Sequence, residues 1–351
     1  MFAISIDPVS RPAARAARER IDQLTKPVGS LGRLEDLAER LASIAGGTPP
    51  SNYERRAVLV GAGDHGVTAE GVSAYPSEVT PQMVGAFLGG FAAINALARA
   101  ARAEVYVADF GIASALPDHP RLLQHATARG TKNFAREPAM TQAQVDAALR
   151  AGVAAFESVR RATGCELLAL GDMGIGNTTS AAAVICALLD VEPEDIAGRG
   201  TGVDDAGFAR KLAAIRAGVA RTRTADWRSV ASEVGGFEIL GLAGALLGAA
   251  KARVPVVLDG FIVAAAALLA QRIAPESIDY CIASHRSRER GHEIALRGLG
   301  LVPLFDLDLR LGEASGAALA LPVVEAAARM IREMKTFAEA GVATAADPAR
   351  A

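Results

Sequence analysis

The sequence predicts a doubly wound α/β protein with a mainly parallel six-stranded sheet, helices on both faces and a small helical domain from the chain ends. Short and almost continuously apolar runs alternate with Ala-, Leu- and Arg-rich stretches of helical period. Strands without polar alternation are typical of parallel sheets whose two faces are both buried. The stretches between them are long enough for the helical crossovers that parallel strands need.

The expected strands, in chain order, are 57–60, 104–108, 166–170, 255–258, 280–283 and 303–305. Between them, 83–103 and 142–163 are long enough for crossover helices. Helical patterns also run from about 12 to 44 and from 317 to 337, outside the strand region. We therefore expect a helical domain of residues 1–50 with 320–351, and an α/β domain of residues 51–319.

Composition narrows the class of protein. The 37 Lys and Arg residues nearly balance the 39 Asp and Glu residues, which argues against a nucleic-acid binder. Cys165, Cys186 and Cys281 lie far apart in apolar runs, which is typical of buried free thiols. The five histidines show no metal-ligand spacing, so no metal site is expected. With no signal peptide and no uninterrupted apolar span, we expect a cytoplasmic protein that does not bind membranes.

Each expected strand is followed by a polar or glycine-rich loop. These loops begin at Gly61, Asp109, Gly171, Asp259, Ser284 and Asp306. In open α/β sheets, ligands bind outside the carboxyl ends of the strands. The sequence therefore predicts a functional site at that edge of the sheet.

Glu313 is the candidate acid–base residue. It follows Gly312 and precedes Ala314, Ser315 and Gly316, so little side-chain bulk stands beside it. A flat substrate could approach its carboxylate closely in a partly dry setting. Such a setting makes a glutamate a useful proton acceptor near neutral pH.

A phosphate site is predicted at the loop after the third expected strand. Gly174, Gly176, Asn177 and Thr178 precede an Ala-rich helix expected to start near Ser180. Glycines permit close approach of the backbone, and free N–H groups at a helix start attract phosphate. The spacing matches neither the dinucleotide fingerprint nor a Walker loop. The alternative is a tight strand–helix turn in which Asn177 and Thr178 are caps.

A second glycine-rich loop could close over the same phosphate. It contains Gly200 and Gly202 and is followed by Lys211 on an expected helix, where the ammonium would serve as the counter-charge. The alternative is a plain surface loop with a solvated lysine.

Two further segments are candidates for substrate contacts. In 73–83, Tyr75 and Met83 could form one wall of an apolar slot while Ser73 or Gln82 contacts a nitrogen heterocycle. The alternative there is a capped helix with Met83 in the core. In the loop after the fifth expected strand, Ser284, His285 and Arg286 are candidate binding residues, with a ribose or carboxylate contact expected from His285 and Arg286. The alternative is that these side chains make loop-orienting hydrogen bonds.

Taken in order, several segments resemble the nicotinate-nucleotide–dimethylbenzimidazole phosphoribosyltransferase family over nearly the whole chain. They are KPVGSLGRLE at 26–35, GDHGV at 63–67, GIGNTT at 174–179, DGFI at 259–262, SHRS at 284–287 and LGE at 311–313. The resemblance implies a six-stranded parallel sheet, a small helical domain, a homodimer and no cofactor. It also implies transfer of phosphoribose from nicotinate mononucleotide to 5,6-dimethylbenzimidazole, which yields α-ribazole 5′-phosphate and nicotinate.

In that family, the glutamate that matches Glu313 is the catalytic base, and the reaction inverts C1′. Two positions depart from the family pattern. Asp172 stands where a glutamate is usual, so its contact to the aromatic base should be shorter or water-mediated. Ala314 replaces a usual glycine and restricts the loop beside Glu313. Both departures bear on the choice of base more than on the reaction.

Two other functions are compatible with the same residues. One is a related phosphoribosyltransferase with another acceptor, such as adenine or a phenol. The other is a non-catalytic nucleotide-binding or scaffold protein. The presence of Glu313 beside complete phosphate loops argues against that function.

Overall fold

The computed structural model describes residues 1–49, 51–200, 202–222 and 226–343. It divides into two compact units, one of residues 1–7 with 55–321 and the other of 8–54 with 322–351. The last eight residues of the helical domain expected from the sequence lie outside the described part. The boundary between the units falls inside one long helix, α13 (Ser315–Glu333), at Pro322.

The first unit contains a parallel six-stranded sheet, as predicted. Its order is β3-β2-β1-β4-β5-β6. The strands are β1 (Arg56–Gly63), β2 (Ala103–Gly111), β3 (Leu122–Gln124), β4 (Leu167–Met173), β5 (Val256–Leu258) and β6 (Cys281–Ala283). The order reverses direction between β1 and β4, which is the place where open α/β sheets bind ligands.

Five of the six expected strands were correct, and the expected strand at 303–305 was wrong. Phe305 makes only an isolated parallel bridge to His285, and Pro303 has no N–H with which to continue a ladder. The sixth strand is instead β3, which pairs with β2 through three residues at the sheet edge. A three-residue strand in a polar stretch carries no periodic signal, so only tertiary pairing defines it.

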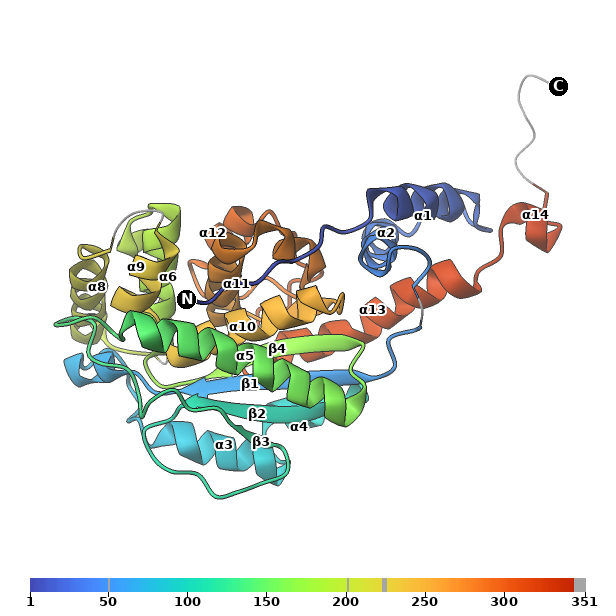
Figure 1. The fold of residues 1–351 in the computed structure, drawn as a ribbon. Helices are drawn as coiled ribbons and strands as arrows, with labels where there is room; N and C mark the ends of the chain where they lie inside the picture. The colour runs from blue at the N-terminus through green and yellow to red at the C-terminus, as the bar shows by residue number, and fades with distance from the viewer. Residues whose placement is uncertain (50, 201, 223–225, 344–351) are drawn as a thin grey trace. The chain divides into compact units, whose positions relative to one another are not determined.

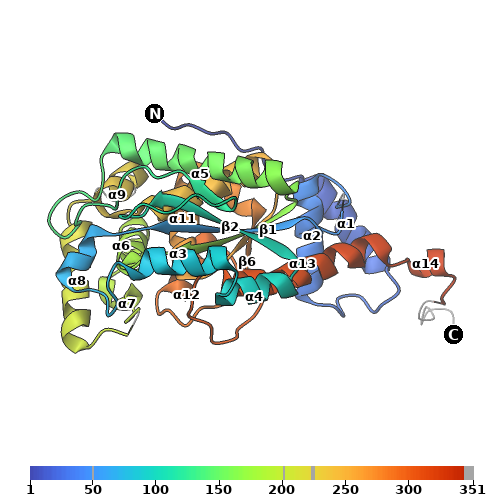
Figure 2. The ribbon, with the colours of Figure 1, turned by 90° about the horizontal axis from the view of Figure 1, so that it is seen from below.

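Helices cover both faces of the sheet, as predicted (Figures 1 and 2). On one face lie α5 (Gln142–Thr163), whose bounds match the prediction, and α10 (Phe237–Lys251). Glycines let these two helices pack closely, since a Cβ on Gly152 would lie 1.9 Å from the Gly241 carbonyl oxygen. The low aromatic content of the chain is compatible with this small-residue packing.

On the other face, two helices replace the single crossover expected at 83–103. These are α3 (Val79–Gly89) and α4 (Ala93–Ala100), both in front of the strands in Figure 2. Gly90 ends α3 in the left-handed conformation, with a φ of 81°. By length and composition alone, Val79–Ala100 is the one stretch among the described residues that could span a membrane. Gly90 breaks that stretch into two shorter helices.

The remaining helices of the first unit lie along the connections and near the site. They are η1 (Gly66–Glu70), α6 (Asn177–Leu189), α7 (Pro193–Ile196), α8 (Asp205–Val219), α9 (Trp227–Val234), α11 (Phe261–Ile273), η2 (Pro275–Tyr280) and α12 (His292–Leu299). Almost every residue of α6 and α11 is buried, which gives rigid supports for the loops before them.

The second unit is helical and comes from both chain ends. It contains α1 (Arg11–Gln23), α2 (Arg33–Ala45), the end of α13 and α14 (Phe337–Ala340). A backbone bridge between Leu24 and Thr336 joins its two chain segments. Lys26 and Glu35, from the first family-like segment, form a buried ion pair of 2.8 Å inside this unit.

Candidate functional site

A cavity of about 390 Å³ opens at the carboxyl edge of the sheet, in the first unit. Segments that follow β4, β5 and β6 line it, together with the residues just before α13, Gly200, Tyr75 and Met83 of α3. Its lining residues are Tyr75, Met83, Asp172, Met173, Gly174, Ile175, Asn177, Thr178, Gly200, Gly260, Phe261, Ile262, His285, Ser287, Glu289, Arg310, Leu311, Gly312 and Glu313. Nine of the residues predicted from sequence are therefore brought together around one space.

Glu313 lines this cavity with a nearly buried side chain, 6% exposed. Its Oε2 has no hydrogen-bond partner within the described part of the chain. Burial raises the pKa of Glu313, and the backbone N–H of Ile94 at the start of α4 lowers it only in part. The carboxylate is thus poorly solvated and lies at the wall of a cavity, a setting typical of a glutamate that accepts protons near neutral pH.

The loop that carries Glu313 fits against the sheet because β4 has a glycine at the contact. A Cβ on Gly171 would lie 2.1 Å from the Ala314 nitrogen. The same holds on the helix side, where a Cβ on Gly316 would lie 2.0 Å from Nδ1 of His285. Two glycines therefore permit backbone approaches that no other residue would allow.

Asp172 lies beside Glu313 at the end of β4. It accepts a hydrogen bond of 2.9 Å from Asn177 Nδ2, and a Cβ on Gly312 would lie 3.4 Å from its carboxylate. Burial, and then the negative charge of Asp259, raise the pKa of Asp172 well above that of an ordinary aspartic acid. A neutral carboxyl at this place can donate a hydrogen bond as well as accept one.

The predicted phosphate loop leads into α6, which begins at Asn177 rather than near Ser180. Gly176 is its N-cap with a φ of 92°, a conformation that favours glycine. Asn177 and Thr178 therefore belong to the first helical turn, where backbone N–H groups and the helix dipole favour an anion.

Lys211, on α8, completes this part of the site. Its ammonium donates a 2.9 Å hydrogen bond to Thr178 Oγ1, and it is only 1% exposed. Burial lowers the pKa of Lys211 to about 8, although Glu289 raises it. A Cβ on Gly200 would lie 3.3 Å from the Lys211 nitrogen, so the second glycine loop lies directly over the ammonium.

Two histidines, His285 and His292, lie next to each other on this side of the site. His285 lines the cavity, and its Nδ1 lies 2.9 Å from Ser284 Oγ. Burial lowers the pKa of His285, and burial with the neighbouring His285 lowers the pKa of His292 to about 3. Both rings are therefore neutral at pH 7, which suits them to hydrogen bonding rather than to charge pairing.

Seven predicted residues do not line the cavity: Ser73, Gln82, Gly176, Gly202, Lys211, Ser284 and Arg286. Three of these contact lining residues or form the helix cap, as described above. Gln82 is exposed, and Ser73 binds the backbone N–H of Tyr75. Arg286 is exposed and pairs with Asp306 through Nε at 3.0 Å, so the structure directs its guanidinium away from the cavity.

A second group of buried charges lies after β1 and at the start of α10, and it includes Glu238, to which the sequence gave no role. His65 Nε2 lies 2.6 Å from Glu238 Oε1, and Asp64 accepts a hydrogen bond from Ala113. Burial lowers the pKa of His65, but Glu238 and Asp64 raise it by more, so the net shift is upward. None of the three residues lines the cavity. The signal in the sequence was the lone Glu238 at the start of an otherwise apolar helix.

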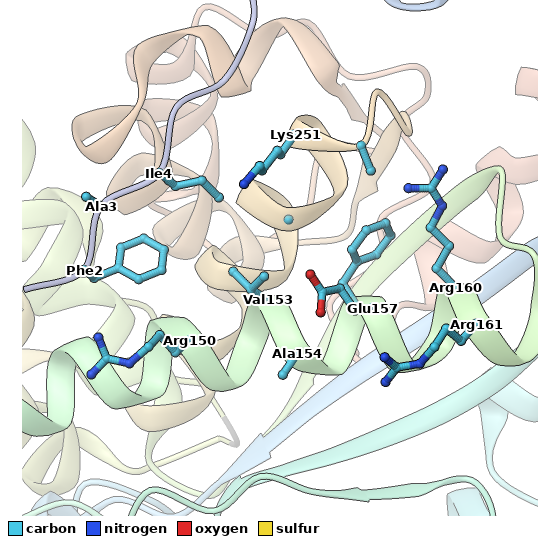
Figure 3. A pocket seen from close by; sticks show the side chains of 13 residues that line it. Phe2, Ala3, Ile4, Arg150, Val153, Ala154, Glu157, Arg160, Arg161 and Lys251 are labelled. Atoms are coloured by element: carbon cyan, nitrogen blue, oxygen red, sulfur yellow. The ribbon is translucent and has the colours of Figure 1, made fainter.

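A larger cavity of about 770 Å³ lies elsewhere, between α5, α10 and the N-terminal segment (Figure 3). Arg150, Arg160, Arg161 and Lys251 surround an apolar floor there, with Glu157 as the one acid. These charged side chains are exposed, and none of the loops that follow the strands lines this cavity. In residues 1–49, 51–200, 202–222 and 226–343, no group of three or more His, Cys, Asp or Glu residues could hold a metal ion.

A family model, curated relatives and a solved structure all relate this chain to phosphoribosyltransferases. A family model described as phosphoribosyltransferase matches residues 6–342. Nicotinate-nucleotide–dimethylbenzimidazole phosphoribosyltransferase from Roseiflexus sp. RS-1 is 52% identical over 339 residues, which is 96% of each chain. The protein of that name from Thermus thermophilus is 53% identical and covers 93% of this chain and 97% of its own. The crystal structure of CobT from the same organism matches with a TM-score of 0.92, covering 95% of this chain and 100% of its own.

Proposed function

This chain belongs to the nicotinate-nucleotide–dimethylbenzimidazole phosphoribosyltransferase family, and on that premise we propose an inverting transfer with Glu313 as general base. The donor would be nicotinate mononucleotide and the acceptor 5,6-dimethylbenzimidazole, the molecules in the relatives' names. The observation that carries the proposal is the unpartnered Oε2 of Glu313, nearly buried at a cavity that also contains the start of α6.

The two ends of the cavity have complementary chemistry. The 5′-phosphate would bind at the first turn of α6, with Thr178 and the Lys211 ammonium as its side-chain partners. The acceptor base would lie against Asp172 and Glu313, with Tyr75 and Met83 as apolar wall. Holding both substrates in line supplies a large part of the rate acceleration.

The transfer itself exchanges one C–N bond for another. A ring nitrogen of the acceptor attacks C1′ with its lone pair while the bond from C1′ to the pyridinium nitrogen breaks. That bond's electron pair neutralises the pyridinium, so nicotinate leaves without needing a proton. The acceptor gains positive charge as it attacks, and its N–H proton passes to the Glu313 carboxylate. Attack from the face opposite to nicotinate converts the β-linked donor into an α-linked product.

The test replaces Glu313 with glutamine, which keeps the shape and removes the basic oxygen. We expect kcat to fall by roughly 10²- to 10⁴-fold, as is usual for loss of a general base. Binding of nicotinate mononucleotide and the unfolding transition should stay close to wild type. Glu157→Gln, the same change at an exposed carboxylate of α5, is the control. Full turnover by Glu313→Gln would exclude the base assignment.

The choice of acceptor can be tested separately from the reaction. Asp172 is one methylene shorter than the glutamate usual in the family and lies in the cavity wall, which favours some tolerance at the base. Chromatography of nicotinate mononucleotide with benzimidazoles, adenine and phenols would rank them. Release of nicotinate only when an acceptor is present would also rule out a non-catalytic nucleotide-binding protein. The homodimer and the cytoplasmic location stay predictions.

A further inference from the structure

The segment that carries Glu313 has an unusual backbone. Gly312, Glu313 and Ala314 are consecutive and all left-handed, with φ of 87°, 63° and 68°. Two of them are not glycine, and such residues persist in this region only where the surrounding structure holds them. Something beyond the local sequence therefore has to hold this loop.

Asp259, at the end of β5, holds it. One carboxylate oxygen, Oδ2, accepts a 3.1 Å hydrogen bond from the Ala314 N–H. The other, Oδ1, accepts hydrogen bonds from the N–H groups of Gly316 at 2.8 Å and Ala317 at 3.0 Å. Asp259 thus binds the loop on one oxygen and the first turn of α13 on the other.

This contact is not an ordinary helix cap, because the acceptor lies more than fifty residues away in sequence. Asp259 is 1% exposed and lies between a buried strand and the buried helix α11, so it has little freedom to move. Gly171 packs closely against Ala314, and His285 packs closely against Gly316. The position of Glu313 is therefore set by the oxygen that holds the next residue.

We propose that Asp259 is a positioning residue for the transfer, acting through Glu313 by holding the Ala314 N–H with Oδ2. The inference rests on the proposed function of Glu313. It assigns to Asp259 no contact with either substrate, and its effect should appear in the proton-accepting step rather than in binding of the nucleotide.

Asp259→Asn is the sharpest change, because the two oxygens have different partners. The single oxygen of asparagine can still accept from Gly316 and Ala317, whereas its NH2 group would then face the Ala314 N–H, two donors against each other. The variant therefore keeps the helix start and loses the bond next to Glu313. We expect kcat with 5,6-dimethylbenzimidazole to fall at least tenfold, and KM for nicotinate mononucleotide to change by less than about threefold.

Two acceptors of different N–H acidity distinguish a misplaced Glu313 from a general structural defect. With 5,6-dichlorobenzimidazole, electron withdrawal makes the N–H more acidic, so transfer depends less on a well-placed base. We expect the ratio of wild-type to variant kcat to be clearly smaller for the dichloro than for the dimethyl acceptor, for both Asp259→Asn and Glu313→Gln. A merely structural defect would reduce both rates by the same factor.

Asp109→Asn is the matched control. Asp109 is also fully buried, lies near the end of strand β2 and accepts hydrogen bonds from two backbone amides, those of Gly111 and Ile112. It does not line the cavity, so turnover per folded enzyme should stay within about twofold of wild type with both acceptors.

A second variant keeps the inference testable if Asp259→Asn does not fold. Ser315→Ala removes a 2.7 Å hydrogen bond from the Ser315 hydroxyl to the Gly312 carbonyl, a milder loosening of the same loop. A several-fold loss of kcat that shrinks with the dichloro acceptor would support the inference. Wild-type kcat, or an equal loss with both acceptors, in whichever of the two variants folds, would overturn it. If Glu313→Gln retains full turnover, the proposed function itself fails.

Discussion

Two groups of buried carboxylates lie at the same edge of the sheet, and only one of them lines the cavity of about 390 Å³. Asp172, near the end of β4, and Glu313, just before α13, both line the cavity. Asp64 and Glu238, with His65, lie at the end of β1 and do not line it. Burial raises the pKa of Glu313 and of Asp64 alike. The chemistry of the residues therefore does not distinguish the two groups.

The two groups differ in whether their side chains line the cavity and in whether they have side-chain partners. In the group at the end of β1, the His65 imidazole lies 2.6 Å from the Glu238 carboxylate, so these two side chains are partners of each other. Glu313 has no side-chain partner among the described residues and opens to a space of substrate size. Unpartnered atoms occur in both groups, including His65 Nδ1 and Glu238 Oε2. An unpartnered buried atom is thus a sign of a reactive site only where a cavity reaches it.

The largest expected effect is on stability, in the group at the end of β1. Glu238→Leu would leave His65 buried without its partner, and breaking a buried pair costs about 3–5 kcal/mol. We expect the free energy of unfolding in urea to fall by that amount, with turnover per folded enzyme within about threefold of wild type. Glu238→Gln, which keeps a hydrogen-bonding group, should lose less. A large fall in kcat at unchanged stability would place Glu238 in the site instead.

The next effect is on binding of the nucleotide. Lys211→Met removes the buried ammonium, and a charge-assisted bond to phosphate is worth about 2–3 kcal/mol. KM for nicotinate mononucleotide should rise by roughly 30- to 150-fold at pH 7. Arg210→Met is the control, since the exposed guanidinium of Arg210 binds the carbonyls of Glu70 and Gly71 instead.

The same variant should differ from wild type in how its stability depends on pH. The folded-state pKa of Lys211 is lowered to about 8, so burying the charged amine disfavours folding below that pH. This cost disappears as pH rises from about 8 to the ordinary lysine value. Lys211→Met should therefore be more stable than wild type at neutral pH and lose that advantage at alkaline pH. No change with pH would show that the ammonium is solvated.

A third effect is the pH dependence of turnover. Only deprotonated Glu313 can accept a proton, and burial raises its pKa. The acidic limb of the kcat profile should therefore lie above the pKa of an ordinary glutamic acid, with kcat falling tenfold per pH unit below it. The stability contribution has the opposite sign, because the folded state holds the proton more tightly and that stabilisation is lost as pH rises. If the acidic limb lay at the pKa of an ordinary glutamic acid, Glu313 would be solvated.

The smallest effect is expected at Ala314. Its left-handed φ of 68° costs an alanine about 1 kcal/mol, which Ala314→Gly would relieve while adding freedom to the unfolded chain. We expect a net change in stability below about 1 kcal/mol and kcat within a few-fold of wild type. Thermal unfolding and the acceptor panel together would measure both. A large change in acceptor preference would show that the alanine, rather than Asp172, selects the base.

Local patterns predicted much of this molecule correctly. The bounds of α5 matched, five strands were in the right places, and Tyr75, Asp172, Thr178, His285 and Glu313 surround one cavity. These features have signals of short range, such as an apolar run or a helical period. The edge strand β3 was missed because it has three residues and no period of its own. The expected strand at 303–305 has the apolar character of a strand but only one bridge.

The sequence by itself determined the fold class, the family and the edge of the sheet where chemistry would occur. All three depend on the order and type of residues along the chain. Tertiary structure alone decided which buried carboxylate meets a cavity and which is enclosed. It also decided that Asp259 holds the Ala314 N–H, although the two residues are more than fifty positions apart. Parallel strands bring distant loops to one edge, and the hydrogen bonds made there depend on distances that no local pattern contains.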